Sequence, residues 1–345
     1  MVFSLVAAVA SVTVPAHARP GEEMEVLQLF YQENDLVVTP TRTPKSISQV
    51  AENITIVTAA EIEAMNAHSV ADVLNTVTGV QIANYTGPAG SPSLSIQGSE
   101  GRQVQVMVDG VSHNNLGDGY PDISSMRVQH IERIEIVKGP ASSSWGSSLG
   151  GVVNIITKSP DDTRKFGGAA SFSIGERATG DFRGEVSGVS GAFGYYLSGG
   201  GLITDGLQPG TDLRSGNFYS KFEWRPRHGS TLTLTTGYDT GARGLARIPL
   251  LDLSIHNRYD YLFSTLTLNQ TLTDELSFDL AFRGSRRNVG IAMDMLSTGE
   301  ELGNTTGVDT NLGGSARLLW QQELHNLIFG VDVDFGKLDS ATVEN

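Results

Sequence analysis

The sequence contains no cysteine among its 345 residues, which excludes thiol chemistry and thiolate metal sites. Positive charge is scarce as well, because 24 Lys and Arg stand against 38 Asp and Glu, a formal net charge of -14. A protein that binds nucleic acid needs a basic surface to neutralise phosphates. The composition therefore argues against a nucleic-acid partner.

Long hydrophobic runs are also missing. The longest apolar stretch, Met1 to Val14, is too short for a transmembrane helix. It is followed by Pro15 and the small-x-small sequence 16–18, which predicts a secretory signal peptide over residues 1–18. A buried helix of the mature protein is the alternative, although the stretch has no polar face.

Residues 50–160 have a mixed α and β pattern. The sequence predicts two helices with capping boxes, one opened by Thr58 and Glu61 and one by Ser69 and Asp72, and Gly79 follows the second helix. Short apolar runs bounded by Gly, Pro, Asn and Ser predict the strands 52–58, 80–84, 93–98, 104–110, 131–139 and 150–158. The region is therefore predicted to be a small α+β domain, and it contains no catalytic cluster.

Residues 161–345 alternate strictly between apolar and polar side chains, the pattern of sheets with one apolar face. We predict nine strands near 166–176, 180–189, 193–204, 216–225, 230–240, 258–271, 275–288, 306–320 and 325–338. Tight turns at one end and long loops at 205–215, 241–257 and 289–305 favour an outer-membrane barrel over a soluble sandwich. Because bacterial barrels close with an even number of strands, the chain is interpreted as the front part of a longer protein.

Three sequence blocks carry a family resemblance: residues 69–82, 93–111 and 131–158. They resemble the signature blocks of the plug domain of TonB-dependent outer-membrane receptors. The resemblance implies an α+β plug domain inside a 22-stranded antiparallel transmembrane β-barrel, of which about nine strands are present here. It also implies a periplasmic linker at residues 19–49, a plug at 50–160 and the first part of the barrel at 161–345.

The stretch DLVVTPTRTP, residues 35–44, resembles the TonB box of that family. Its two prolines, Pro40 and Pro44, prevent it from continuing as a strand of its own domain, so we predict an unpaired segment open to strand addition by a partner sheet. An ordinary first strand of the plug is the alternative. The predicted box comprises Asp35, Leu36, Val37, Val38 and Thr39.

Two loops of the predicted plug, 84–92 and 112–121, are rich in turn-forming residues and are candidates for ligand contact, because binding usually resides on loops of a rigid scaffold. The predicted ligand-binding residues are Asn84, Tyr85, Asn114, Asn115 and Tyr120. Loop acids offer oxygen ligands for calcium, but no spacing supports a calcium site, and the seven histidines are too scattered for a metal site. The acids concerned are Asp118, Asp122, Asp239 and Asp252.

Charged residues on the predicted plug strands suggest ion pairs between plug and barrel, with ordinary solvated strand faces as the alternative. They are Arg102, Glu132, Arg133, Glu135 and Lys138.

The resemblance implies ligand-gated active transport of a scarce nutrient, a ferric siderophore or cobalamin, across the outer membrane of a Gram-negative bacterium. The implied partners are TonB with its inner-membrane energy-transducing complex, the small-molecule metal chelate and outer-membrane lipid. No resident cofactor and no enzymatic activity are implied. A passive porin or adhesin, a soluble secreted enzyme with β domains and a non-functional truncated receptor remain alternatives. TonB-independent uptake would favour the porin, and recovery from the periplasm without detergent would favour the enzyme.

Overall fold

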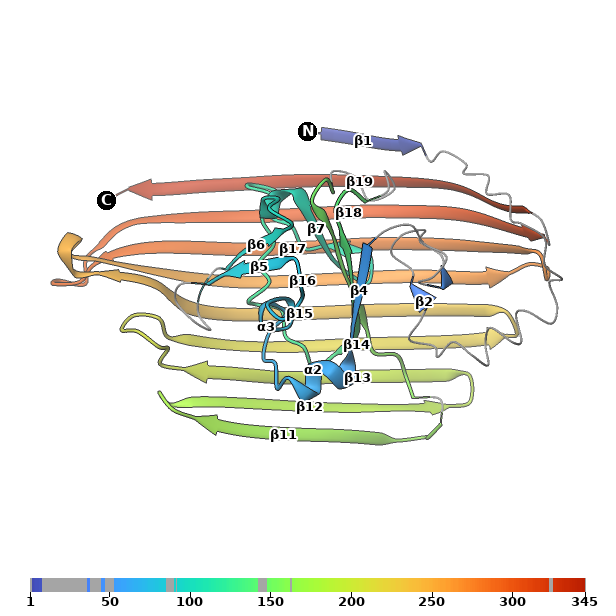
Figure 1. Cartoon of the computed structure of the whole chain (residues 1–345), viewed down its shortest axis with the longest axis horizontal. Helices are drawn as coiled ribbons and strands as arrows, with labels where there is room; N and C mark the ends of the chain where they lie inside the picture. Colours follow the sequence, from blue (N-terminus) through green and yellow to red (C-terminus); the bar gives the residue numbers. More distant parts are fainter. Residues whose placement is uncertain are drawn as a thin grey trace.

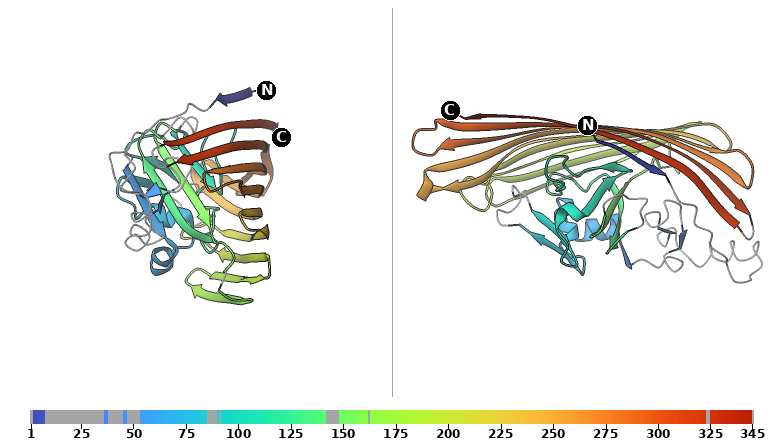
Figure 2. Two further views of the ribbon diagram at one scale, coloured as in Figure 1. Left: turned by 90° about the vertical axis from the view of Figure 1, so that its right-hand side faces the viewer. Right: turned by 90° about the horizontal axis from the view of Figure 1, so that it is seen from above.

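The fold was taken from a computed structural model, which describes residues 53–84, 90, 92–141, 148–161, 163–322 and 325–344, and the backbone of 2–7, 36–37 and 45–46. The remaining residues, including most of the predicted signal peptide and linker, lie outside the described part. The chain forms a small α+β domain, here called the plug, and a large curved sheet, here called the wall. Figure 1 shows the plug in front of the wall, and Figure 2 shows it against the concave side of the wall.

The plug is built around a mixed five-stranded sheet in the order β4-β9-β10-β7-β8, with β7 and β10 parallel and the other neighbours antiparallel. A separate hairpin-like pair joins β5 to β6. The strands are β4 (Asn53–Thr58), β5 (Val80–Ala83), β6 (Ser93–Ile96), β7 (Val104–Val108), β8 (Val111–Ser112), β9 (Ile131–Lys138) and β10 (Gly151–Thr157). The helices are α2 (Ala59–Ala64), α3 (Val70–Leu74) and the short 3-10 helix η4 (Gly101–Gln103).

Local chemistry in the plug follows the predictions closely. The Thr58 and Ser69 side chains accept hydrogen bonds from the backbone N–H of Glu61 and Asp72, whose carboxylates bind back to the cap, so both capping boxes are confirmed. Gly79 has φ +83, which fits a residue that ends a helix. Strand β10 is buried along nearly its whole length, as its continuous apolar run predicted.

The wall is an antiparallel meander of nine consecutive strands, each paired with the next in the sequence. The predicted number and order of strands are therefore confirmed. The strands are β11 (Gly167–Gly175), β12 (Thr179–Ser190), β13 (Phe193–Thr204), β14 (Leu213–Arg227), β15 (Ser230–Ile248), β16 (Leu253–Thr271), β17 (Leu276–Met295), β18 (Glu301–Gln322) and β19 (His325–Glu344). The 3-10 helix η6 (Pro249–Leu251) joins β15 to β16, and β1 (Val2–Ala7) pairs with β19.

Two of the predicted long loops are wrong. Residues 241–248 and 253–257 extend β15 and β16, and 289–295 and 301–305 extend β17 and β18, which leaves short connections at 249–252 and 296–300. Gly241, in the first of these segments, lies against Tyr259, where an added Cβ would come within 2.5 Å of the phenol oxygen. Glycine thus makes room for a ring on the neighbouring strand. The short connections from β14 to β15 and from β16 to β17 lie where the sequence predicts tight turns.

The wall strands are taller than a bilayer requires. Strand β18 has 22 residues, about 70 Å at about 3.3 Å per residue, whereas a membrane strand needs about 9–11 residues. Large apolar side chains such as Phe282 and Leu312 are exposed, while the alternate residues Arg287 and Asp309 are buried on the plug side. In the described residues no helix is both long enough and apolar enough to cross a membrane.

The predicted TonB box is only partly described. Leu36 and Val37 form β2 (Leu36–Val37), which pairs with β3 (Lys45–Ser46) in a sheet separate from that of the plug. The expectation that this segment is unpaired is therefore wrong for these two residues, which pair with Ser46 and Lys45. Asp35, Val38 and Thr39 lie outside the described residues.

Candidate functional site

The candidate functional site is the seam between plug and wall, where buried polar side chains from both parts meet. The hydrophobic core of the plug continues across this seam, since four wall aromatics are buried in the same apolar cluster as the plug residues. These are Tyr196, Tyr219, Tyr261 and Phe263. The polar contacts below are set around them.

The first polar contact begins in the tight turn between β7 and β8. Asp109 and Gly110 have φ of +45 and +81, as a two-residue hairpin turn of this kind requires. The turn points the Asp109 carboxylate toward the wall, where it accepts a hydrogen bond of 3.0 Å from the Tyr219 hydroxyl on β14. Thr157, at the end of β10, binds the same carboxylate at 2.5 Å, and Lys221 on β14 donates to the Thr157 carbonyl at 2.9 Å. The turn thus anchors the central plug strands to β14.

A second contact lies next to it. The His130 ring stacks on the Tyr219 ring with centroids 4.7 Å apart and an interplanar angle of 12°. Lys158 of the plug pairs with Glu185 on β12 at 2.7 Å, and that carboxylate also accepts a hydrogen bond of 2.6 Å from Tyr196. Burial lowers the pKa of His130 to about 4, so the imidazole is neutral near pH 7.

The most extensive pairing of one side chain centres on Arg243 of β15, which is 7% exposed. Its guanidinium binds the Asp122 carboxylate at 2.7 Å, the Ser124 hydroxyl at 2.8 Å and the Gly90 carbonyl at 3.3 Å, all on the plug. Asn257 accepts a further hydrogen bond of 3.1 Å, and the Tyr259 ring lies 5.2 Å from the guanidinium carbon. Burial alone would raise the pKa of Asp122, but attraction and hydrogen bonding from Arg243 hold it below its usual value.

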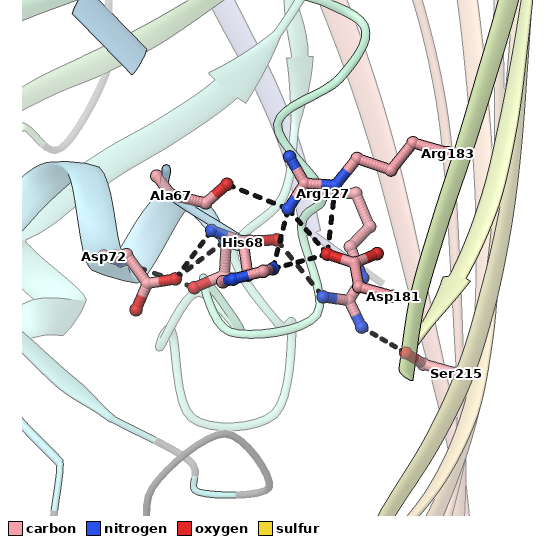
Figure 3. A network of polar contacts seen from close by, with 8 residues as sticks. Ala67, His68, Asp72, Arg127, Asp181, Arg183 and Ser215 are labelled. Carbon is pink, nitrogen blue, oxygen red and sulfur yellow. Dashed lines mark hydrogen bonds and ion pairs between the residues drawn. The ribbon is translucent and has the colours of Figure 1, made fainter. Parts of the chain in front are cut away.

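A further network joins the start of α3 to β12 and β14 (Figure 3). Asp181 accepts hydrogen bonds from Arg183 at 2.6 and 3.0 Å and contacts the His68 ring. Arg183 also donates to the Ala67 carbonyl at 3.0 Å. From the plug, Arg127 donates to the His68 carbonyl at 3.1 Å and to the Ser215 hydroxyl. Burial lowers the pKa of Arg127, although its guanidinium stays charged.

The loop that follows β8 contacts β16, β17 and β18. The His113 ring, 2% exposed, lies edge-on to Tyr261 and Phe263 with centroids 4.5 and 5.2 Å away. Arg287 donates to the His113 carbonyl at 2.8 Å, and Asp309 accepts a hydrogen bond of 3.1 Å from the Leu116 amide. Burial, aided by repulsion from Arg287, lowers the pKa of His113 well below its usual value.

A small cavity of about 10 Å³ lies within the seam, which is room for one water molecule. Its polar lining comes from both parts: His113, Arg127 and His130 of the plug and Asp239 of the wall. The rest of the lining is apolar, and it consists of Val70, Val108, Met126, Ile131, Ile155 and Phe263.

The predicted ligand-binding residues have different environments. Asn84 is exposed at the end of β5, and Tyr85 lies outside the described residues. The Asn114 side chain binds the backbone of Val106, Val104 and Gly119 at 2.8 to 2.9 Å, so it holds its own loop together.

Asn115 and Tyr120 belong to the same loop. The Asn115 side chain accepts a hydrogen bond of 2.7 Å from Gly117, and Tyr120 is 37% exposed. The structure therefore brings these two residues and Asn114 together in one loop.

Among the residues proposed for ion pairs between plug and barrel, the two arginines pair within the plug. Arg133 pairs with Glu135 at 3.0 Å and with Glu132 at 3.5 Å, and Arg102 pairs with Glu100 at 2.5 Å. The sequence pattern of the plug does not indicate which of its charges face the wall. The wall partners that were missed include Asp181 and Lys221, which stand next to apolar residues on their strands. Charged residues at alternate positions of a barrel strand were the signal that could have found them.

A metal site receives no support from the described residues, which contain no group of three or more potential His, Asp or Glu ligands. Three of the four acids considered for calcium have other partners. Asp122 pairs with Arg243, Asp118 accepts a hydrogen bond from the Tyr120 amide at 2.9 Å, and Asp252 accepts one from the Ser297 amide at 2.9 Å.

Comparison with known proteins agrees with this architecture. Residues 46–152 match the model of the TonB-dependent receptor plug domain. The chain is 27% identical over 338 residues to the vitamin B12 transporter BtuB of Vibrio vulnificus (strain CMCP6), an alignment that covers 92% of this chain and 54% of that protein.

Solved structures share the fold at lower identity. The ferric preacinetobactin receptor BauA of Acinetobacter baumannii is 15% identical with a TM-score of 0.75, over 91% of this chain and 51% of that one. The ferripyoverdine receptor of the outer membrane of Pseudomonas aeruginosa is 15% identical with a TM-score of 0.74, over 90% and 46%. The chain thus spans about half the length of the proteins it matches.

Proposed function

Because this chain belongs to the TonB-dependent outer-membrane receptor family, we propose that it serves the ligand-gated, TonB-dependent transport of a scarce nutrient across the outer membrane. The observation that carries the proposal is a plug of this family held against the inner face of a wall of long antiparallel strands. A plug seated by several separate polar contacts can block a barrel and yet be released when they are broken together. The relatives are transporters and receptors, and the proposal involves no covalent chemistry.

The substrate we propose is a metal chelate, with cobalamin considered first. The relative aligned along nearly the whole chain is a vitamin B12 transporter, and this supports a corrinoid. A ferric siderophore is the second candidate, because the structural neighbours include receptors of that class. We propose that Asn84, Tyr85, Asn115 and Tyr120 contact the ligand, and that Asn114 positions the loop that carries two of them.

We further propose that the segment Asp35 to Thr39 is captured by TonB, which is driven by its inner-membrane complex. The β2–β3 ladder contains only two residue pairs, Leu36 with Ser46 and Val37 with Lys45. Opening so short a ladder costs little, and it frees an extended backbone for strand addition to a partner sheet. In Figure 1, β2 lies toward the end of the wall where a short connection joins β16 to β17, and short turns mark the periplasmic end of such barrels.

This proposal assigns residues 1–18 to a signal peptide, 19–49 to a periplasmic linker, 50–160 to the plug and 161–345 to the barrel. Uptake in cells that lack other receptors for the substrate tests the transport. We expect accumulation of radiolabelled cyanocobalamin, or of a ferric siderophore, that is lost when TonB is deleted. Binding to the cell surface should persist without TonB. Equal uptake with and without TonB would contradict the proposal and favour a passive pore.

A further inference from the structure

Two buried histidines of the plug, His113 and His130, have no role in the proposed transport. They are 2% and 7% exposed, and both line the water-sized cavity described above. Each has one buried ring nitrogen, Nε2 of His113 and Nδ1 of His130, without a hydrogen-bond partner among the described residues. Buried polar atoms are seldom left unpaired, so an unpaired nitrogen on each of two neighbouring rings indicates a water or a proton site.

Other unpaired polar atoms lie nearby on the same seam. Among the described residues they include the side-chain amides of Gln129, next to His130 on the plug, and of Asn217 on β14. The two amides are close neighbours, because a Cβ built on Gly200 would lie 3.3 Å from the nitrogen of Gln129 and 3.3 Å from the oxygen of Asn217. Ser198 on β13 adds a third unpaired atom. The seam beside β13 and β14 therefore contains several polar atoms without hydrogen-bond partners among the described residues. Water can enter there when the plug loosens.

The charged groups around each ring determine whether protonation of the imidazole is favourable in the docked plug. His130 faces Asp109, Lys158 and Lys221, and it stacks on Tyr219. One carboxylate against two ammonium groups gives no net attraction for a third positive charge.

The surroundings of His113 are no more favourable to a cation. Arg287 donates to its backbone carbonyl, and Tyr261 and Phe263 enclose the ring. Arg127 and Asp239 line the cavity beside it. The docked plug therefore holds both histidines in sites suited to neutral imidazole.

We propose that the cavity holds a water beside His113 and His130, and that protonation of these two histidines favours release of the plug from the wall. The docked state excludes the protons and the released state, with its imidazoles in water, accepts them. The plug is thereby linked to pH at a point remote from the ligand loops and from the TonB box. This inference goes beyond the transport proposal, since it concerns docking alone and requires neither substrate nor TonB.

The sign and size of the effect follow from linkage. The pKa of His130 is about 4 when docked and about 6.5 when exposed to water. His130 therefore does not affect docking above about pH 7, and it weakens docking as the pH falls from 6.5 toward 4. Between pH 7.5 and pH 5.0, His130 alone should raise the equilibrium constant for release about 30-fold. His113 acts in the same direction, because its pKa is also lowered.

Hydrogen–deuterium exchange of the protein in detergent tests this, without substrate or TonB. The peptide 104–131 is followed from pH 7.5 to 5.0, with correction for the intrinsic pH dependence of exchange. Because the Asp239 carboxyl of the same cavity is present in every variant, the readout is the opening constant of the wild type relative to that of the double variant His113→Phe/His130→Phe. This variant keeps the aromatic packing without the two imidazoles, and we expect the ratio to rise at least 30-fold between pH 7.5 and pH 5.0. The control variant His228→Phe, on an exposed turn of the wall, should behave as the wild type.

A ratio of wild-type to double-variant opening constants that rises less than threefold would overturn the proposal. If the double variant does not assemble, the single variant His130→Phe must lose about 30-fold of the rise, and the proposal is wrong if it does not. None of these outcomes depends on uptake, so transport would still be tested separately.

Discussion

Replacement of Arg243 by methionine should loosen the plug without unfolding the wall. Methionine keeps most of the length of the arginine side chain but removes every contact to Asp122, Ser124 and the Gly90 carbonyl. Removal of one partner from a fully buried ion pair costs about 3–5 kcal/mol. The Asp122 side chain is 25% exposed and regains some water, so we expect a loss of about 2–4 kcal/mol in docking free energy. The equilibrium constant for release should rise about 30- to 900-fold.

Thiol labelling measures this loss. Because the chain contains no cysteine, the substitution Met126→Cys supplies a single reporter at a plug position that is 6% exposed. Maleimide labelling should accelerate by the factor above in the background of Arg243→Met. Arg247→Met is the matched control, since this exposed arginine lies on the same strand. Labelling of the Arg243 variant within threefold of the control would refute the reasoning.

The pH dependence of this pair separates it from the histidines. The pKa of docked Asp122 lies below its usual value of 3.8, so its contribution to docking is fully present above about pH 4 and is lost as the pH falls further. In Arg243→Met, burial without the guanidinium raises the pKa of Asp122, so protonation of this carboxyl should reduce the difference between wild type and variant as the pH falls toward 5.0. In a double-mutant cycle with Asp122→Asn, the two losses should not add, because both substitutions break the same contact.

Three further predictions concern other parts of the chain. Val37→Pro should abolish energised uptake but leave ligand binding at the cell surface intact, and loss of both would identify a structural strand. Gly151→Ala should lower the free energy of unfolding in guanidinium by about 3 kcal/mol, and Gly110→Ala by about 1 kcal/mol. Only at Gly151 would the new Cβ meet a carbonyl oxygen, at 2.4 Å. Equal losses would contradict this. Tyr219→Phe should weaken docking by about 1–2 kcal/mol in the labelling assay, whereas Tyr238→Phe, whose hydroxyl binds Asp260 within the wall, should not change it.

Features set by neighbouring residues were predictable from the sequence, and features set by distant ones were not. The capping boxes of Thr58 and Ser69 depend on residues three positions apart, and the wall strands on a two-residue period, so both could be predicted. By contrast, Asp122 and Arg243 lie 121 positions apart, and His68 and Asp181 lie 113 apart. No local pattern specifies which charges meet over such separations.

One residue type can serve two purposes, and this limits what composition alone predicts. Glycine serves a turn or a close approach between strands, and at Gly241 it serves the latter. Asparagine can bind a ligand or fasten its own loop, and Asn114 uses both amide hydrogens and its carbonyl oxygen on the backbone. Composition alone could not separate these uses, whereas the position of the neighbouring ring or carbonyl does.

The shared apolar cluster limits how freely this architecture can be recombined during evolution. Tyr196, Tyr219, Tyr261 and Phe263 come from the wall but complete the interior of the plug. A plug exchanged for that of another receptor would meet rings shaped for a different partner, and its own interior would be left with gaps. Grafting experiments should therefore succeed only when these four aromatics are transplanted with the domain. The plug and these wall residues are expected to evolve together.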